Sequence, residues 1–299
     1  MDAPSARNSS LPSLSQGRLC ILLAAILWSL SGGFSKVLTK DTGLGLNHPE
    51  VQAFTIAFYR ALFAGVVLLP ALRVQDLSFR WMMGVMVACF AAMNVTFVTA
   101  LTAGSAANAI LLQYTGPMWM YLVSVRWLGE PPDRRSFYGL AVGLIGILVI
   151  VGGESQNDQL PIVLIGLGSG LAYAGVILCI RILREASSRW LTILNHLISA
   201  LVLLPVIWTL ASPTLPQFVC LFLFGALQMG LPYWLVARGL RVVSPQEAGM
   251  ITLLEPLLNP LWAYLVAREV PKLPTFIGGA LILGALAWRY WPFRKTWGS

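Results

Sequence analysis

The sequence predicts an all-α integral membrane protein with ten transmembrane helices arranged as two inverted five-helix repeats. Three observations support this fold class. Hydrophobic residues make up 57% of the 299 residues and charged residues only 11%, a balance that a soluble globule could not cover with a polar surface. Charged residues, prolines and turn residues divide the chain into ten apolar segments. The two halves of the chain also resemble each other in sequence.

Each apolar segment is long enough for a membrane span, which needs about 20 mainly apolar residues. Residues 1–17 are rich in Ser and Pro, and we expect them to form a disordered cytoplasmic N-terminus. The run after Arg18 is too long for a removable signal peptide and is expected to stay as the first span. In order, the predicted spans are 18–39, 49–72, 80–102, 105–128, 134–153, 160–184, 188–210, 215–240, 244–268 and 273–292. A short cytoplasmic tail, 293–299, follows.

The positions of the basic residues predict the orientation of the chain. If the N-terminus is cytoplasmic, fifteen Lys and Arg residues lie at the cytoplasmic ends of the spans and four at the other ends. The remaining base, Arg60, lies within a span. By the positive-inside rule both termini are cytoplasmic. We therefore expect a multi-pass protein of the plasma (inner) membrane, surrounded by lipid.

The repeat is visible in residues that recur at a fixed distance. Val67-Leu68-Leu69-Pro70 recurs as Val202-Leu203-Leu204-Pro205, and Trp28 and Lys36 align with Tyr173 and Arg181. A second set recurs 139 residues later: Leu101, Ser105, Ala109, Pro117, Glu130, Pro132, Phe137, Gly139 and Ala141 match Leu240, Ser244, Ala248, Pro256, Glu269, Pro271, Phe276, Gly278 and Ala280.

The number of spans in each half determines how the halves are related. Residues 18–153 and 160–292 contain five predicted spans each. Because five is odd, the second copy must enter the membrane from the opposite face. Inverted repeats of this kind are typical of secondary transporters, which bind substrate near the midplane between the repeats.

Several of these residues together resemble a known family. The first span contains a Trp and the second an Arg. The fourth span has a pattern of Ser, Ala and Pro that ends at Glu130, and this pattern recurs around Leu254-Glu255-Pro256. Together these features resemble the drug/metabolite transporter superfamily, specifically its ten-helix EamA-type transporters. The resemblance covers Arg18 to about Trp291. It implies an exporter or exchanger of small metabolites such as amino acids, with a cavity lined mainly by spans 1, 3, 4, 6, 8 and 9. Arg268 departs from the family, which usually has Gly there.

Glu255 is the single acidic residue near the centre of a predicted span, whereas the other eleven lie in loops or at helix ends. A charge at the bilayer centre costs about 2.5–3.5 kcal/mol on insertion scales, so such a residue marks a functional site by default. Glu255 could bind a proton or recognise a substrate amine. It could instead cap backbone groups freed by the neighbouring prolines, or pair with a base, in a purely structural role.

Two adjacent spans are predicted to be weakened. Pro256 and Pro260 remove helical hydrogen-bond donors from the ninth span, and Gly230 and Pro232 loosen the eighth. Pro117 repeats the first of these kinks in the fourth span, but the residue before it is Gly116, so the carboxylate has no copy. We expect the eighth and ninth spans to form a moving gate.

Two further ionisable residues lie within spans. Arg60 could pair with Glu255 or contact an anionic substrate, but an Arg in this position can also extend toward lipid phosphates. His196, with Asn195, occupies the corresponding place in the second repeat. It could titrate near neutral pH or be buried and hydrogen-bonded to a neighbouring helix.

Polar and aromatic residues at mid-depth complete the candidate site, because rings around a few convergent polar groups are what a small-molecule pocket requires. Interfacial anchoring is the alternative role for Trp and Tyr. These candidates are Trp28, Asn94, Gln113, Tyr114, Tyr173, Gln228 and Tyr233.

Other classes of function find less support in the sequence. The four cysteines fall in four different spans and the two histidines have no nearby metal-ligand partners, so we expect no metal and no cofactor. The bases do not form the stripe that nucleic-acid binding requires. We expect no enzymatic activity, since paired carboxylates are absent from the spans and Gly166-Leu167-Gly168-Ser169-Gly170 lacks the nucleophile spacing. An intramembrane enzyme and an uncoupled channel or sensor remain the alternatives.

The expected partners follow from this interpretation. They are lipid and a small molecule, either an amino acid or another metabolite, with drugs as a further class. Pairs of glycines four residues apart, such as Gly166 and Gly170, allow close helix approach. We expect them to pack within a monomer, with a dimer as the alternative.

Overall fold

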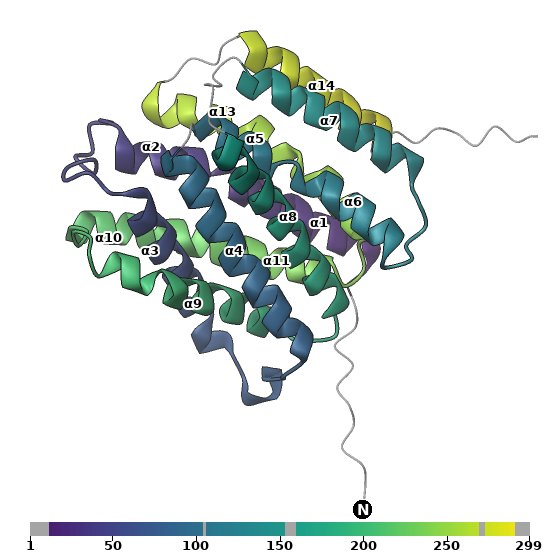
Figure 1. Ribbon diagram of the computed structural model, residues 1–299, viewed down its shortest axis with the longest axis horizontal. Helices are drawn as coiled ribbons and strands as arrows, with labels where there is room; N and C mark the ends of the chain where they lie inside the picture. Colours follow the sequence, from purple (N-terminus) through teal and green to yellow (C-terminus); the bar gives the residue numbers. More distant parts are fainter. Residues whose placement is uncertain (1–11, 104–105, 153–159, 269–272, 291–299) are drawn as a thin grey trace, which may run out of the picture.

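The computed structural model describes residues 12–103, 106–152, 160–268 and 273–290 (Figure 1). Within these residues the chain is helical and contains no β-strand. Seven helical segments are long and apolar enough to cross a membrane, and α14 is a further, shorter apolar helix. The predicted all-α membrane fold is therefore confirmed.

The first repeat follows the predicted spans closely. Its helices are α1 (Leu14–Ser29), α2 (Ser31–Thr39), α3 (Ala53–Val66), α4 (Trp81–Ala103), α5 (Ala106–Gln113), α6 (Gly116–Arg126) and α7 (Arg134–Gly152), with 3-10 turns η1 (Leu69–Ala71) and η2 (Val74–Asp76). Helix α1 begins four residues before the predicted Arg18, because Ser13 and Gln16 form a reciprocal capping box that satisfies its first backbone donors.

The second repeat contains the same number of spans. Its elements are α8 (Leu160–Ile182), α9 (Ser188–Ile207), α10 (Leu215–Leu223), the π-helix η3 (Phe224–Gly230), α11 (Leu231–Gly239), α12 (Pro245–Thr252), α13 (Leu254–Ala267) and α14 (Leu273–Tyr290). The eighth span is one continuous path through α10, η3 and α11. Its π-helix packs closely on α3, where a Cβ added to Gly225 would lie 2.7 Å from the Arg60 carbonyl oxygen.

Three spans break near their middle. The first breaks at Leu30, the fourth at Tyr114 and Thr115, and the ninth at Leu253. In the fourth and ninth spans the break lies just before Pro117 and Pro256. These prolines offer no N–H to the residue four positions earlier, so the helix cannot continue its hydrogen-bond ladder there.

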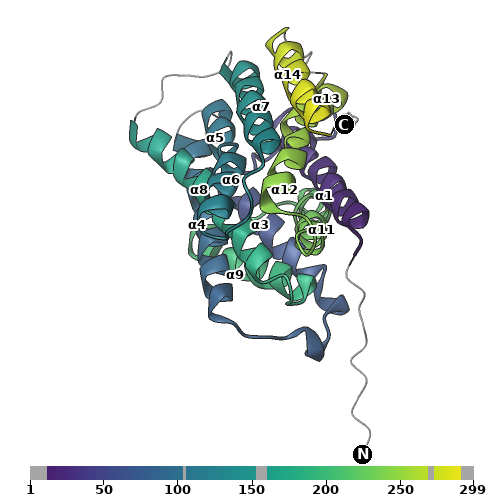
Figure 2. The ribbon, with the colours of Figure 1, turned by 90° about the vertical axis from the view of Figure 1, so that its right-hand side faces the viewer.

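The packing of the helices reflects the inverted repeat. Helices α3 and α7 pack against their own copies, α9 and α14, and α6 of the fourth span packs against α12 of the ninth span, which copies it. Helix α1 packs on α11, and in the matching arrangement α8 packs on α4. Figure 2 shows α7 and α14 standing side by side at one edge of the bundle. Exchanging the two halves therefore preserves these main contacts, as a two-fold relation requires.

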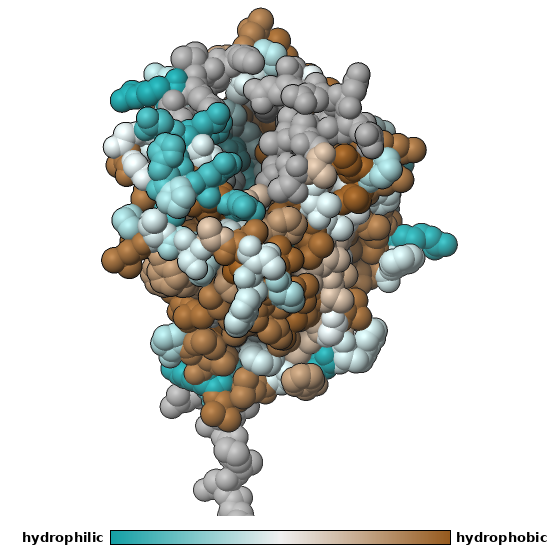
Figure 3. All heavy atoms as spheres, turned by 60° about the vertical axis from the view of Figure 1, so that its left-hand side comes forward, coloured by the Kyte–Doolittle hydropathy of each residue, from teal (hydrophilic) through white to brown (hydrophobic). Residues whose placement is uncertain are grey.

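The outer surface of the bundle is apolar. Large hydrophobic side chains such as Leu164, Leu201 and Phe276 are exposed on it, and Figure 3 shows brown, hydrophobic atoms across the middle of one face. Hydrophilic residues gather beside a hollow at one end of this view. This distribution suits a protein whose belt faces lipid and whose polar opening faces water.

Candidate functional site

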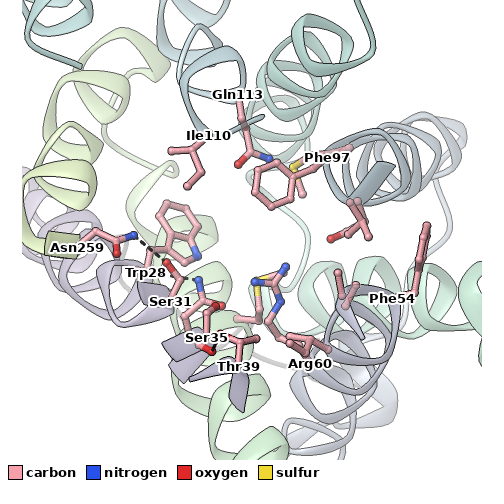
Figure 4. Close-up of a pocket in the computed structure, with 18 of the residues that line it drawn as sticks. Trp28, Ser31, Ser35, Thr39, Phe54, Arg60, Phe97, Ile110, Gln113 and Asn259 are labelled. Carbon is pink, nitrogen blue, oxygen red and sulfur yellow. Dashed lines mark hydrogen bonds between the residues drawn. The ribbon is translucent and has the colours of Figure 1, made fainter. Parts of the chain in front are cut away.

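A cavity of about 540 Å³ lies between the two repeats. Residues of α1, α2, α3, α4, α5, α8, η3, α11 and α13 line it (Figure 4). Its mouth lies at the ends of α2 and α3, near Thr39, Glu50 and Gln52. We call this end the mouth face, and the opposite end, where α1 begins, the N-terminal face. A cavity of this size suits a small organic molecule.

Aromatic rings from three spans form the floor of the cavity. The Trp28 ring lies 6.3 Å from Tyr173 and 5.1 Å from Tyr233, centroid to centroid, both in edge-to-face geometry. The Gln228 side chain donates a hydrogen bond of 3.3 Å to the Trp28 carbonyl oxygen. Because these residues come from both repeats, the floor forms only when the two halves pack together.

Two opposite charges lie in the cavity. Arg60 projects from α3, with its guanidinium carbon 5.4 Å from the centre of the Phe224 ring, and Figure 4 shows it pointing into the open space. Glu255 lies in the first turn of α13, directly after the break in the ninth span. The Tyr114 hydroxyl donates a hydrogen bond to its carboxylate. Arg60 and Glu255 are close enough to interact electrostatically.

A line of hydroxyl groups extends from the floor toward the mouth. Ser31, Ser35 and Thr39 recur every fourth residue, so they lie on one face of α2. The Asn259 amide donates a hydrogen bond of 3.2 Å to the Ser31 hydroxyl (Figure 4). This contact joins α2 of the first repeat to α13 of the second beside the cavity.

One of the predicted site residues lies outside the cavity. His196 is fully buried, and its Nδ1 lies 2.8 Å from the Thr192 carbonyl oxygen. Its ring packs against Phe90 and Tyr233, with centroids 4.6 and 5.0 Å apart. Asn94, by contrast, lines the cavity, although it also donates a hydrogen bond of 3.1 Å to Ser199.

The other predicted site residues come together in one place. Nine of the ten substrate candidates line the cavity: Trp28, Arg60, Asn94, Gln113, Tyr114, Tyr173, Gln228, Tyr233 and Glu255. Of the predicted kink residues, Pro117 in α6 and Pro256 in α13 lie just after helix breaks, Gly230 and Pro232 lie where η3 passes into α11, and Pro260 lies inside α13.

Comparison with known proteins identifies the family that has this architecture. The family model of EamA-like transporters matches residues 15–152 and 160–290, one match for each repeat. The chain belongs to the EamA-like transporter family. The similarity in the two halves thus reflects two copies of the EamA unit, and this protein is a multi-pass membrane transporter by family.

Individual relatives of this EamA protein are distant but match over nearly their whole length. An uncharacterised transporter of Archaeoglobus fulgidus is 27% identical over 91% of this chain and 96% of its own. The pseudopaline exporter CntI of Pseudomonas aeruginosa is 26% identical over 88% and 93%. An S-adenosylmethionine uptake transporter of Rickettsia prowazekii is 21% identical over 98% of each chain.

The EamA fold is also seen in solved structures. One crystal structure superposes with a TM-score of 0.80 at 18% identity, covering 92% of this chain and 96% of that chain. At this level of identity the likeness concerns the fold.

Several lining residues of this EamA protein were not among the predicted site residues. Ser35, Thr39, Phe54, Phe97 and Asn259 all line the cavity. The four-residue spacing of the hydroxyls in α2 was a usable signal. Nothing in the sequence pattern indicated that Phe54 and Phe97 face inward, because aromatic residues occur on both the lipid-facing and inward-facing sides of membrane helices.

Proposed function

We propose that this protein is a secondary transporter that exports or exchanges small metabolites carrying both an amine and a carboxylate, by alternating access. The cavity between the repeats supports this proposal. Beyond the mouth, where Glu50 lies, its described lining holds a cation, Arg60, a carboxylate, Glu255, and an aromatic floor at Trp28. These groups complement the two charges and the apolar part of an amino acid-like molecule.

The two charged residues have distinct roles in this proposal. Arg60 binds the carboxylate of the cargo, since a guanidinium presents several donors to a carboxylate. Glu255 binds the ammonium group, or a proton when the cargo is absent. An α-amino acid carries both groups, and so does S-adenosylmethionine, which is named for two of the relatives.

The orientation of the chain gives the direction of the open state. With both termini in the cytoplasm of a cell enclosed by the plasma (inner) membrane, the mouth face is outside. The structure then corresponds to an outward-open state, from which cargo has been released or can be exchanged. Repeats 18–153 and 160–292 move relative to each other, and the eighth span, with its π-helix, and the broken ninth span accommodate the movement.

Counterflow in proteoliposomes tests the proposal. Purified full-length protein is reconstituted with one unlabelled candidate inside, and uptake of the same labelled compound is followed. We expect saturable counterflow of at least one amino acid or related zwitterion, and none of its amide or deaminated analogue. Uptake that never saturates indicates a channel, and turnover without transmembrane movement indicates an enzyme; either result contradicts the proposal.

A further inference from the structure

The residues in α8 that match the cavity lining of α2 are buried. Ser31 and Ser35 follow Trp28 by three and seven residues and line the cavity. Val176 and Ile180 follow Tyr173, the match of Trp28, by the same distances, and are 0% and 2% exposed. The second repeat therefore has the corresponding wall, but no opening beside it.

The same relation holds between α3 and α9. Ala57 and Arg60 precede Val67 by ten and seven residues and line the cavity. Thr192 and Asn195 precede Val202 by the same distances and are not among the residues that line it. Asn195 is 0% exposed whereas Arg60 is partly exposed, and Ala57, at 2%, is as buried as Thr192. Likewise Phe97 of α4 lines the cavity and is partly exposed, while its match in α11, Val236, is 1% exposed. Val98, which also lines the cavity, and its match Ala237 are both 2% exposed.

Asn195 is unusual among these buried residues. Neither its Nδ2 nor its Oδ1 has a hydrogen-bond partner within the described part of the chain, and Nε2 of the adjacent His196 also lacks one. Each unsatisfied buried polar group costs about 1–3 kcal/mol. Arg60, the match of Asn195, reaches open space in the cavity. A second conformation that opens beside Asn195 would satisfy its amide in the same way.

Ion pairs between the repeats lie at the N-terminal face. Arg18 of α1 pairs with Glu247 of α12 at 2.8 Å, and Arg289 of α14 pairs with Asp133 before α7 at 2.8 Å. In each pair one partner belongs to the first repeat and the other to the second. Asp133 makes a second contact with the second repeat, because its backbone N–H donates a hydrogen bond of 3.4 Å to the Gln246 side chain.

We propose that the second repeat forms a second binding cavity, closed in this structure, which opens at the N-terminal face with Asn195 in the place of Arg60. The cavity is lined by Val176, Ile180, Thr192, Asn195, Val236 and Ala237, and the Arg18–Glu247 and Asp133–Arg289 pairs keep it closed. It takes the same class of cargo, a small zwitterion, but offers the carboxylate a neutral amide instead of a guanidinium. The cargo carboxylate is therefore held more weakly there than at Arg60. This proposal rests on the alternating-access function.

Two cysteine substitutions report the opening of each cavity. Thr192→Cys, the inner reporter, lies in the closed cavity, and Ser35→Cys, the outer reporter, lies in the open one, where Ser35 is partly exposed. Full-length protein in sealed vesicles of known orientation is treated with a membrane-impermeant maleimide, and labelling at each position is read by mass spectrometry of its peptide, so that the native cysteines can stay. The measurement requires no cargo, so its outcome is independent of whether counterflow is found.

The ion pairs are then removed. Arg18→Gln with Arg289→Gln should raise labelling of the inner reporter from the N-terminal face by about tenfold, and lower labelling of the outer reporter from the mouth face. Arg80→Gln is the matched control, since its pair with Glu185 at 3.4 Å is largely exposed and should contribute little. Unchanged labelling of the inner reporter, or a parallel rise at both reporters, overturns the proposal. If the double variant does not fold, Asp133→Asn replaces it.

A second variant tests the role of Asn195 itself. Asn195→Leu removes two unsatisfied polar atoms from the closed cavity, so it should raise the melting temperature and reduce labelling of the inner reporter by about tenfold. Asn94→Leu is its control, and should lower the melting temperature because Asn94 donates to Phe90 and Ser199. A melting temperature that falls for Asn195→Leu, with unchanged labelling, contradicts the assignment of Asn195. The affinity for the zwitterion completes the test. In the Asn195→Arg variant, the zwitterion should bind more tightly from the N-terminal face, and the affinity for its amide should not change.

Discussion

The Tyr233 ring packs edge-on against the Trp28 ring, with centroids 5.1 Å apart and planes 69° apart. One ring comes from the first repeat and the other from the second, and together they separate the open cavity from the buried residues beyond. Aromatic pairs in this geometry contribute about 0.5–1.5 kcal/mol beyond the area that they bury. In the proposed mechanism, contacts across the floor connect cargo binding to the packing of the two halves.

Replacing Trp28 with Ala should weaken cargo binding, whereas Trp28→Phe should largely preserve it. The Ala variant removes a ring that contacts both Tyr173 and Tyr233, and we expect a tenfold or larger rise in KM, about 1.4 kcal/mol. Counterflow kinetics measure the change. Equal KM values for the two variants would mean that the ring does not contact the cargo.

Glu255→Gln should reduce counterflow strongly, by about a hundredfold, and remove its dependence on pH. The amide keeps the shape of the side chain and a hydrogen bond with Tyr114, but it has no charge for an ammonium group and no site for a proton. Glu185→Gln, which alters an exposed loop carboxylate, is the control. Wild-type rates with wild-type pH dependence in Glu255→Gln would reject the proposed role.

Arg60→Gln should selectively weaken the binding of cargo that carries a carboxylate. The guanidinium is the cation that projects into the cavity in Figure 4, and losing a charged hydrogen bond costs about 1.5–3 kcal/mol. We expect KM to rise at least tenfold for the zwitterion and to change little for its amide. Arg60→Lys should be intermediate, because it keeps the charge without the planar fork. If the KM rises equally for both compounds, Arg60 stabilises the fold and does not bind the cargo carboxylate.

Gly170→Ala should destabilise the protein, whereas Gly168→Ala should not. A Cβ at Gly170 would lie 2.5 Å from the Thr115 hydroxyl and 2.6 Å from the Leu112 carbonyl oxygen, while nothing lies within 4 Å of one at Gly168. Overpacking of this kind costs about 1–3 kcal/mol. Thermal unfolding in detergent compares the two variants. The contact also shows that this glycine packs on α5 within one chain, as its spacing predicted.

Acid should favour the closed N-terminal face through Glu130. Burial raises the pKa of this carboxyl above its ordinary 4.5, despite the charge of Arg181 at 3.4 Å. A raised pKa means that the closed state binds the proton more tightly than an open, solvated state. The closed state therefore gains stability as the pH falls through the raised pKa toward 4.5. Lowering the pH from about 7 to about 5 should reduce labelling of the Thr192→Cys reporter relative to that of the outer reporter, which corrects for the general loss of thiolate, and Glu130→Gln should remove this relative response.

Asp133 responds in the opposite direction at lower pH. Burial raises its pKa, but the Ser136 hydroxyl, the Arg289 charge and two backbone N–H groups outweigh burial, and the pKa lies below the ordinary 3.8. Its stabilisation of the closed state is present above that value and is lost as the pH falls through the lowered pKa. Asp133→Asn should therefore loosen the N-terminal face at neutral pH, where Glu130→Gln does not.

Much of the fold follows from local sequence, because spans must be apolar and about 20 residues long. The positions of Glu255 and Arg60 were predictable for a related reason. A charged side chain within a span is costly to expose to lipid, so it faces the interior of the protein. His196 satisfied the same rule and still lies outside the cavity. Its Nδ1 finds a partner one helical turn away, in the Thr192 carbonyl, and no periodicity in α9 distinguishes that outcome from cavity lining.

Contacts between distant parts of the chain were harder to predict from the sequence. The Asn259–Ser31 hydrogen bond and the Arg18–Glu247 pair each join residues more than two hundred positions apart, and sequence spacing carries no information on such contacts. The π-helix η3 was also not predicted. The segment contains Gly225 and Gly230 and is followed by Pro232, and these residues are compatible with a kink, a break or a π-turn alike.

In the proposed mechanism, the lack of a second carboxylate opposite Glu255 limits the stoichiometry of transport. Gly116 occupies the matching position in the first repeat, so Glu255 can carry at most one proton or one ammonium group in each cycle. Moving one elementary charge through 100 mV supplies about 2.3 kcal/mol. This single site could therefore drive a concentration ratio of about fiftyfold per 100 mV, and a steeper gradient would require a second ionisable group.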